Sequence, residues 1–481
     1  MTIHDKITYT GFLNYRGIDF SYVLANDELK LIAPSEKSDE IRYHWLMKAA
    51  GDGVFVNGDP LVVEEKSIAG ICNESNGSII FLPKVGSFIR STMNLLGNAA
   101  PILYIELSAY ILCKYDREYI SRISFSGPEI NYIHPVNQVF SWSFNEEDHV
   151  NGVFKIETKD FASTTSKEQS FTVDGATVVS KFGITRGVSM GIGESPLSIR
   201  STLMFEFDPC NDYSFVLRLC RIAKLYIRFL CYRRNVCLNE IELSAPYEGG
   251  KYEKFATLHL VGEKYDPEEK ALKNNRYIRQ LYVSDGESKI LQDIADNMLY
   301  LRHIPDSYES GRHIDAARFV MITAAFEWEF NRMMPEGMPK SDGRKAAEER
   351  VNAEIDSLIA TRSGREKDIY KFLKKLIGAA SLQNEIVTVC EKLDAVVGVF
   401  GKRLFAMNHE ELSYPQMGKR LSDQRNHYAH GDIDKDFIGL SLLDLIFLEY
   451  IVYAMQLKHY GIPDDCIRKA INELFHLNYA I

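Results

Sequence analysis

The sequence predicts an α+β multidomain protein in which an antiparallel, sandwich-like or barrel-like β-rich domain precedes an all-helical bundle. Three observations lead to this prediction. Short runs of β-branched and aromatic residues, each bounded by turn-forming residues, fill the first half of the chain. From about Glu287 onward, apolar residues recur with the 3.6-residue period of helices. The chain has 481 residues, of which 46% are hydrophobic, so it can bury the cores of two or three domains.

The predicted strands of the first half are bounded by Gly, Asn, Pro or Ser. They cover residues 53–58, 78–83, 122–127, 139–144, 152–161, 170–184 and 201–208. Asp174-Gly175 lies between two apolar runs and predicts a tight hairpin. An amphipathic helix near 213–232, with basic residues along one side, is expected to close this domain. Further strands over 241–262 follow, so we expect the β-rich domain to occupy residues 1–260.

The second half is predicted to be helical throughout. The expected helices lie near 287–302, 312–334, 343–361, 365–379, 383–404, 417–428, 434–460 and 464–477. Pro and Gly residues separate them, for example at Pro305, at Ser363-Gly364 and at Pro463. We expect residues 261–310 to form a helical connector and residues 311–481 to form one α-helical domain.

Composition narrows the class of protein. The formal net charge is -10, which disfavours a protein that coats nucleic acid or anionic membranes without specificity. The N-terminus has no apolar leader segment, and no uncharged apolar run of eighteen residues occurs, so no membrane span is expected. The eight cysteines form no CxxC pair, which favours buried, reduced thiols in a cytoplasmic protein over a zinc site.

One segment, LSDQRNHYAHGD over residues 421–432, concentrates groups that bind phosphate and move protons. Arg425 offers a planar fork of donors for a phosphate. His430 can give and take protons near neutral pH. Cleavage of RNA needs both functions, because the 2′-OH must lose a proton, the leaving 5′-oxygen must gain one, and the charge of the phosphorane must be neutralised. An Arg–His pair can supply these without a metal.

Geometry sets a condition on this pair. Residues five apart lie roughly 140° apart around an ideal helix, so Arg425 and His430 do not share a helical face. They can converge where the segment straddles a loop and a helix start, or where two copies meet across a dimer. Gly431 fits an irregular backbone there. Asp432 or Asp434 can cap the helix expected to follow.

The run Arg425-Asn426-His427-Tyr428-Ala429-His430 resembles the ribonuclease motif of the HEPN superfamily, whose domains are helical bundles with Arg and His four to six residues apart near a long late helix. An earlier predicted helix, ARFVMITAAFEWEFNRMM with Glu327, resembles the first HEPN helix. The pairing of a β-rich N-terminal domain with such a bundle resembles the ApeA family of bacterial anti-phage proteins.

This resemblance implies a metal-independent endoribonuclease that acts in abortive infection, often on tRNA, as a homodimer with two motifs facing one another. Carried over to this chain, it implies that His430 is the acid–base residue, that Arg425 holds the scissile phosphate and that Asn426 orients the motif or the substrate. Glu327 is expected to support Arg425, and His427 to be accessory. The β-rich domain is then expected to be a sensor or regulator that binds a trigger, such as a phage component. No cofactor, metal or membrane is expected.

Other interpretations of the same residues stay open. The cluster can belong to a non-catalytic module that binds RNA, nucleotide or protein, or it can be purely structural, with Asn426 as a cap and Arg425 paired to Asp423. His427 and His430 also suggest a transition-metal site. The acidic residues that follow them are Asp432, Asp434 and Asp436. A calcium loop is excluded, because Phe437 and Leu443 stand where glycine and glutamate are needed.

A second basic stretch, from Arg332 to Lys375, has acids interleaved with its basic residues. It holds Arg332, Lys340, Arg344, Lys345, Arg350, Arg362, Arg365, Lys367, Lys371, Lys374 and Lys375. We expect a mixed, solvated face, and a surface that follows the phosphates of RNA is the alternative.

Overall fold

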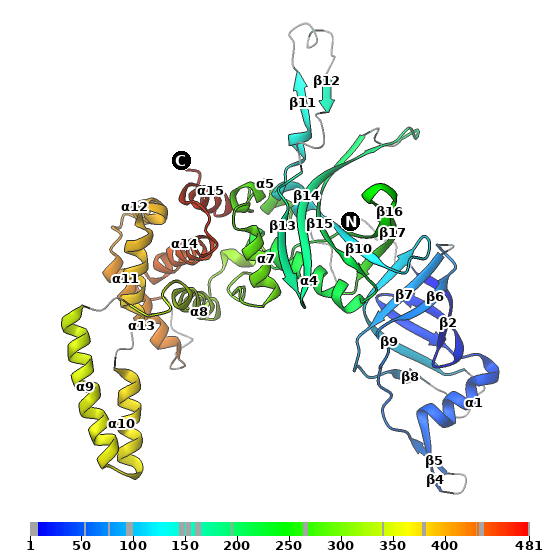
Figure 1. Cartoon of the computed structure of the whole chain (residues 1–481), viewed down its shortest axis with the longest axis horizontal. Coiled ribbons are helices and arrows are strands. Elements are labelled where there is room, and N and C mark those ends of the chain that lie inside the picture. Colours follow the sequence, from blue (N-terminus) through cyan, green and yellow to red (C-terminus); the bar gives the residue numbers. More distant parts are fainter. Residues whose placement is uncertain are drawn as a thin grey trace. The chain divides into compact units, whose positions relative to one another are not determined.

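The computed structural model describes residues 8–51, 54–75, 77–92, 100–143, 150, 155–158, 165–193, 195, 197–262, 268–338, 341–377, 381–429, 431 and 437–479. The chain forms two compact units, and Figure 1 traces both. The first comprises Met1–Leu230, Asn235–Glu269 and Leu291–Asp296, and the second comprises Cys231–Arg234, Lys270–Ile290 and Asn297–Ile481. The first is β-rich and the second is helical, which confirms the predicted fold class.

A closed antiparallel barrel forms the start of the first unit. Its strands are β1 (Tyr9–Tyr15), β2 (Ile18–Ala25), β3 (Glu28–Ile32), β6 (Ile68–Cys72), β7 (Gly77–Pro83) and β9 (Ile102–Cys113). Long β9 closes it, because the half over Ile102–Glu106 pairs with β3 and the half from Leu107 onward pairs with β7. Alternate side chains of β2, including Phe20 and Tyr22, point into the core, as expected for strands with one buried face.

The same sheet continues past β9 as a second, open part of the first unit. Its further strands are β17 (Lys251–Leu260), β16 (Glu240–Tyr247), β10 (Ile120–Ser126), β15 (Leu197–Cys210), β14 (Ala176–Val188) and β13 (Gln169–Val173), in sheet order. Asp174 and Gly175 both have positive φ and join β13 to β14 as the predicted hairpin turn. Helix α4 (Tyr213–Cys231) matches the predicted amphipathic helix, and its apolar side is buried.

Short elements complete the first unit. They are β4 (Met47–Gly51) paired with β5 (Val54–Asn57), β8 (Arg90–Thr92) paired with β9, β11 (Phe140–Ser143) paired with β12 (Lys155–Thr158), α1 (Ser38–Glu40), α2 (Pro128–Ile133), the 3₁₀ turns η1 (Ser35–Lys37), η3 (Val136–Val139) and η5 (Glu248–Gly250), and the π-helical turn η2 (Ile41–Leu46). Strands β1, β2, β3, β4, β6, β8 and β9 lie outside the predicted runs. Helix α7 (Glu287–Ala295) has most of its length in this unit.

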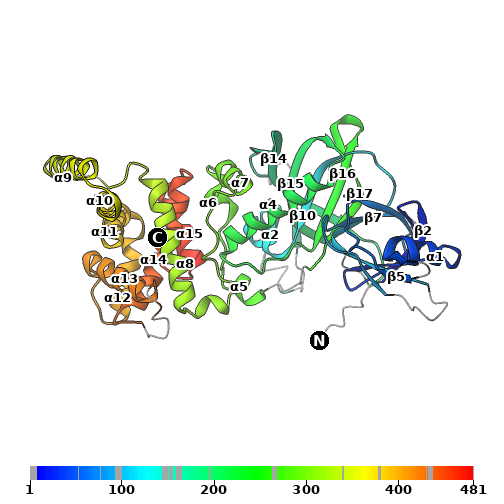
Figure 2. The ribbon, with the colours of Figure 1, turned by 90° about the horizontal axis from the view of Figure 1, so that it is seen from below.

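The second unit is a helical bundle. Its elements are α5 (Glu269–Lys273), α6 (Gln280–Val283), η6 (Ser310–Arg312), α8 (Ala316–Met333), α9 (Asp342–Thr361), α10 (Gly364–Leu376), α11 (Leu382–Leu393), the π-helical turn η7 (Asp394–Gly398), α12 (Val399–Met407), α13 (Tyr414–Ala429), α14 (Ser441–His459) and α15 (Asp464–Leu474). Helix α14 is the centre of the bundle, with fourteen of its nineteen residues buried. Helices α8 and α14 lie side by side (Figure 2).

Three predicted helix boundaries are wrong, and local backbone geometry explains two of them. Helix α14 begins at Ser441 rather than near residue 434, because Gly439 has φ of 54°, which a helix does not accommodate. Its N-cap is Leu440, so neither Asp432 nor Asp434 caps it. Helix α7 ends at Ala295 rather than near 302, two residues before Asn297 at φ of 56°. The helix predicted over 383–404 is divided by η7 into α11 and α12.

Two global features complete the description. All eight cysteines lie in the part of the chain that the structure describes, and all are free thiols. Of the helices built from described residues, none combines the length and the apolar character needed to cross a membrane.

Candidate functional site

The Arg-His segment lies at the end of a helix, not at the start of one. Arg425, Asn426 and His427 occupy the last two turns of α13, which ends at Ala429. Asn426 is exposed inside the helix, so the interpretation of Asn426 as an N-cap is wrong. His427 is half-buried. The segment is therefore positioned by α13 and by the helices packed against it.

Arg425 is paired with a carboxylate of another helix. Its Nη2 lies 3.1 Å from Oε1 of Glu327 in α8, rather than beside Asp423 as the structural alternative assumed. Both side chains are partly exposed, at 42% for Arg425 and 36% for Glu327. The ring of Tyr428 packs against that of Phe319, with centroids 5.3 Å apart, which aligns α13 with α8. Within the described residues, Nε and Nη1 of Arg425 have no acceptor, so two edges of the fork can receive a phosphate.

Arg425 and Glu327 line an open polar cavity of about 440 Å³. The full lining is Glu327, Asn331, Ser381, Leu382, Glu385, Ser422, Arg425 and Asn426. It therefore combines one guanidinium with two carboxylates, amides and hydroxyls, a set that suits polar recognition and proton transfer more than it suits an apolar ligand.

Glu385 is the charged lining residue that sequence reasoning missed, along with Asn331, Ser381, Leu382 and Ser422. Burial raises the pKa of its carboxyl, and the nearby charge of Glu327 raises it further, whereas Arg425 opposes the shift. It comes from α11, which approaches α13 closely at Gly418: a Cβ there would stand 2.7 Å from the carbonyl oxygen of Gln383. A glycine inside a predicted helix was the available signal for this approach.

Two buried polar contacts fix α13 against α14 and against the chain that returns to it. Arg420 donates from Nε and Nη2 to both carboxylate oxygens of Asp444, at 2.6 and 2.8 Å. The amide oxygen of fully buried Gln424 accepts from the backbone N–H of Ile438 at 2.9 Å and from Ser441 Oγ at 3.2 Å. The two ends of the segment that follows α13 are thus fixed next to the site.

The proposed proton carrier, His430, lies outside the described residues, as do Asp432, Asp434 and Asp436. On either side the chain is described. Gly431 has φ of 91°, and its N–H donates to the carbonyl of Tyr428 at 3.2 Å. Phe437 packs its ring against Phe319, with centroids 6.0 Å apart. The irregular backbone expected at Gly431 is therefore present.

Several basic residues of the second basic stretch form ion pairs with neighbouring acids. On α9 and α10, Arg344 pairs with Glu348 at 2.9 Å, and Lys374 reaches across to Asp356. Further pairs join Arg362 to Glu366 and Lys371 to Asp368. This is the mixed, solvated face that the interleaved acids predicted. The alternative metal site at His427 and His430 depends on residues outside the described part of the chain, and no three His, Cys, Asp or Glu side chains inside that part cluster as metal ligands.

Comparisons of the chain with models of known protein families, with curated proteins and with solved structures gave no match. The function is therefore inferred from the residues of this chain and their geometry.

Proposed function

We propose that this protein is a metal-independent endoribonuclease of the HEPN type that cleaves RNA, in particular tRNA, as an abortive-infection effector against phage. The observation that carries the proposal is the placement of Arg425: it is held by Glu327 at an open polar cavity, has two edges of its guanidinium without an acceptor among the described residues, and lies five residues before His430. One short segment thus supplies a group that can bind a phosphate, Arg425, and a group that can transfer a proton, His430.

In the proposed reaction, the free Nε and Nη1 edges of Arg425 bind the scissile phosphate and stabilise the phosphorane. His430 takes the proton of the 2′-OH, or gives one to the leaving 5′-oxygen, according to which copy of the segment it belongs to. Exposed Asn426 contacts the RNA or orients Arg425. A homodimer with two facing segments supplies the acid and the base together.

The β-rich unit is proposed to regulate this activity. A ribonuclease that cuts host RNA has to be silent until a trigger arrives, and a closed barrel is a scaffold whose loops can bind one. We propose that a phage-derived component binds to this unit. No partner beyond RNA, a second copy and the trigger is required.

A second candidate function is a module that binds RNA, nucleotide or protein without cleaving it, and one observation favours its protein-binding form. The cavity places two carboxylates, Glu327 and Glu385, beside the single guanidinium of Arg425. Their charge opposes a phosphate unless Glu385 is protonated, the direction in which its pKa is shifted. Binding without cleavage needs no His430 and would leave the RNA intact.

The test is paired expression of the wild type and of His430→Ala in a bacterial host under phage challenge, with total RNA sequenced for new 3′ ends. We expect discrete cuts with the wild type and a loss of at least about 100-fold with His430→Ala, the usual size of a general acid–base contribution. His313→Ala, which removes an exposed histidine of the same unit, is the matched control and should cut like the wild type. Purified protein should cut in EDTA and leave 2′,3′-cyclic phosphate ends.

Three outcomes would contradict the ribonuclease proposal. Cuts that persist in His430→Ala would assign the chemistry to other residues. Activity abolished by EDTA and restored by a transition metal would favour the metal site. RNA retained by the protein and never cut, in the presence of phage protection, would favour the binding module.

A further inference from the structure

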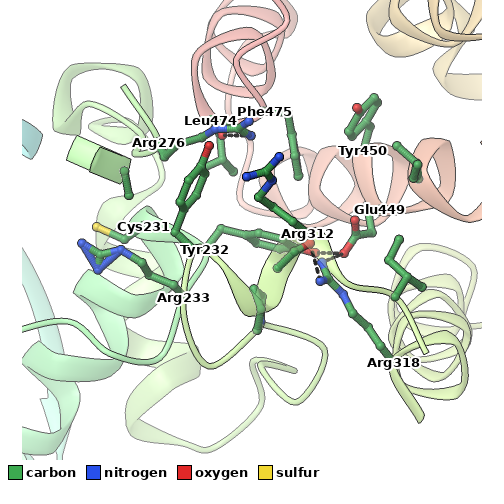
Figure 3. A pocket seen from close by; sticks show the side chains of 16 residues that line it. Cys231, Tyr232, Arg233, Arg276, Arg312, Arg318, Glu449, Tyr450, Leu474 and Phe475 are labelled. Atoms are coloured by element: carbon green, nitrogen blue, oxygen red, sulfur yellow. Dashed lines mark hydrogen bonds and ion pairs between the residues drawn. The ribbon is translucent and has the colours of Figure 1, made fainter. Parts of the chain in front are cut away.

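A second cavity in the helical unit is rich in arginine and separate from the Arg425 site. It has a volume of about 240 Å³, and Figure 3 shows its lining. The lining is Cys231, Tyr232, Arg233, Ala271, Arg276, Pro305, Tyr308, Gly311, Arg312, Ile314, Arg318, Ile446, Glu449, Tyr450, Leu474 and Phe475. All of these belong to the second unit. The lining thus includes four arginines and a single carboxylate, that of Glu449.

Arg318 already has its counter-ion. Arg318 donates from Nη2 to Oε1 of Glu449 at 2.6 Å, and both side chains are nearly buried, at 11% and 7% exposure. Its Nη1 donates to the carbonyl of Gly311 at 2.6 Å. The hydroxyl of Tyr232 donates to the same carboxylate oxygen at 2.7 Å. Glu449 is therefore used by Arg318 and Tyr232 and is not available to neutralise the other arginines.

The remaining positive charge lies with Arg276 and Arg312. Arg276 donates from Nη1 to the neutral carbonyl of Leu474 at 3.2 Å, and its buried Nε has no acceptor in the described part of the chain. Arg312 is 61% exposed and makes only a long contact, 3.5 Å, with exposed Glu309. In Figure 3, Arg276, Arg312 and Arg318 reach toward the cavity, whereas Arg233 points away from it. Arg276 and Arg312 are both directed at this space without a buried counter-ion of their own, and an anion between them would offset the repulsion of their charges.

Four aromatic residues also line the wall, Tyr232, Tyr308, Tyr450 and Phe475. The rings of Tyr450 and Phe475 lie 4.5 Å apart, and the guanidinium of Arg276 lies over the ring of Tyr308 at 5.4 Å. Tyr232 holds φ of 51°, a left-handed conformation that is strained for an aromatic residue and that recurs at ligand sites. A planar ring can pack against such a wall while the arginine forks bind its phosphate.

We propose that this cavity binds a small phosphorylated ligand, of about the size of a mononucleotide. Arg312 at the rim and Arg276 inside bind the phosphate, and Arg318 with Glu449 and Tyr232 forms the fixed floor. The volume of the cavity lies just below the usual range for ligand pockets, roughly 300–1,000 Å³, which excludes a long oligonucleotide from its interior.

The test is calorimetric titration of the full-length protein, in a phosphate-free buffer, with AMP, with inorganic phosphate and with adenosine. Arg276→Gln and Arg312→Gln remove the proposed phosphate ligands, and Arg318 is left intact because its loss would leave buried Glu449 unpaired. Arg362→Gln is the matched control: this arginine is 53% exposed and pairs with Glu366 at 3.7 Å, as Arg312 pairs with Glu309.

We expect AMP to bind the wild type and Arg362→Gln equally, and to bind Arg276→Gln and Arg312→Gln at least about tenfold more weakly, as expected for one charge-assisted contact. Inorganic phosphate should also bind the wild type and Arg362→Gln more tightly than it binds the two cavity variants. Adenosine should bind the wild type at least about tenfold more weakly than AMP does. The proposal is overturned if neither AMP nor phosphate binds at millimolar concentration, if the two cavity variants bind AMP like the control, or if adenosine binds as well as AMP.

Discussion

The ion pair between Arg425 and Glu327 determines how the candidate site presents its guanidinium. Glu327 takes only Nη2, so the carboxylate fixes the plane of the fork and leaves the other edges to a substrate. The pair is partly exposed, and exposed pairs contribute about 0–1 kcal/mol to the free energy of unfolding. Its main effect is therefore expected on the position of Arg425, so we expect Glu327 to act as a positioning residue.

Glu327→Gln separates that positioning effect from stability. We expect the melting temperature to change little, because the variant removes one partly exposed pair. RNA cleavage should fall about tenfold or more, mainly in kcat. Without Glu327, Arg425 can still bind the phosphate of the substrate, but it is no longer held in the position that stabilises the transition state. Thermal unfolding and single-turnover cleavage measure the two effects.

Glu366→Gln is the control for this experiment, because it breaks an exposed pair with Arg362 that lies away from the cavity. It should leave both quantities unchanged, and Glu327→Asp should restore part of the cleavage rate. Cleavage by Glu327→Gln at the wild-type rate would remove Glu327 from the site.

At the level of elements, the contact between α13 and α14 fixes the helix that presents Arg425. Asp444 is fully buried, and burial raises the pKa of its carboxyl while Arg420 opposes that shift. Removing one partner of a buried pair leaves an uncompensated charge, which is costly. The position of α13 thus depends on Arg420.

Arg420→Gln should lower the free energy of unfolding at pH 7 by about 3 kcal/mol, the lower end for a buried pair, because Arg420 is 22% exposed. Without Arg420, the folded-state pKa of Asp444 rises further above its ordinary value. A raised folded-state pKa favours folding at pH values below it, so the loss should shrink as the pH falls from 7 toward 5. Urea unfolding at both pH values measures this. A loss of stability that grows toward pH 5 would contradict this role of the Arg420–Asp444 pair. Arg344→Gln, which breaks an exposed pair within a helix, is the control and should lower the free energy of unfolding by under about 1 kcal/mol at either pH.

Elements with strong local periodicity could be predicted from the sequence. Elements and site residues whose placement depends on long-range contacts could not. Helices α8, α9, α13 and α15 could be predicted to within a few residues. The barrel strands β1–β3 and β9 could not, although β1 to β3 pair as local hairpins, because the burial of their inner faces depends on the closure of the barrel through β9. For the site, Arg425 and Glu327 were recognisable together from a resemblance. Glu385 was not, because a single glutamate on an amphipathic helix is ordinary until Gly418 brings α11 close.

At the level of the whole molecule, the two units are interleaved along the chain. Residues 270–290 and 297–310 belong to the helical unit, although the sequence suggested a connector over 261–310. Their contacts with the bundle are specific. Fully buried Gln456 donates to the carbonyl of Tyr300 at 3.1 Å, Trp328 donates to the carbonyl of Met298 at 3.2 Å, and Tyr282 donates to Glu473 at 2.8 Å.

These contacts predict which fragment of the helical unit can fold. A fragment over residues 270–481 keeps them and should unfold cooperatively, with lower stability than the full chain because it lacks Tyr232, the hydroxyl donor to Glu449. A fragment over residues 311–481 leaves the amide of Gln456 and the apolar faces of α14 and α15 without their covering residues. We expect it to lose near-ultraviolet circular dichroism and to bind a hydrophobic dye, as loosely packed states do. Urea unfolding followed by both probes compares the fragments. If the 311–481 fragment unfolds as sharply as the longer one, then residues 270–310 are a connector after all and the core of the bundle is complete without them.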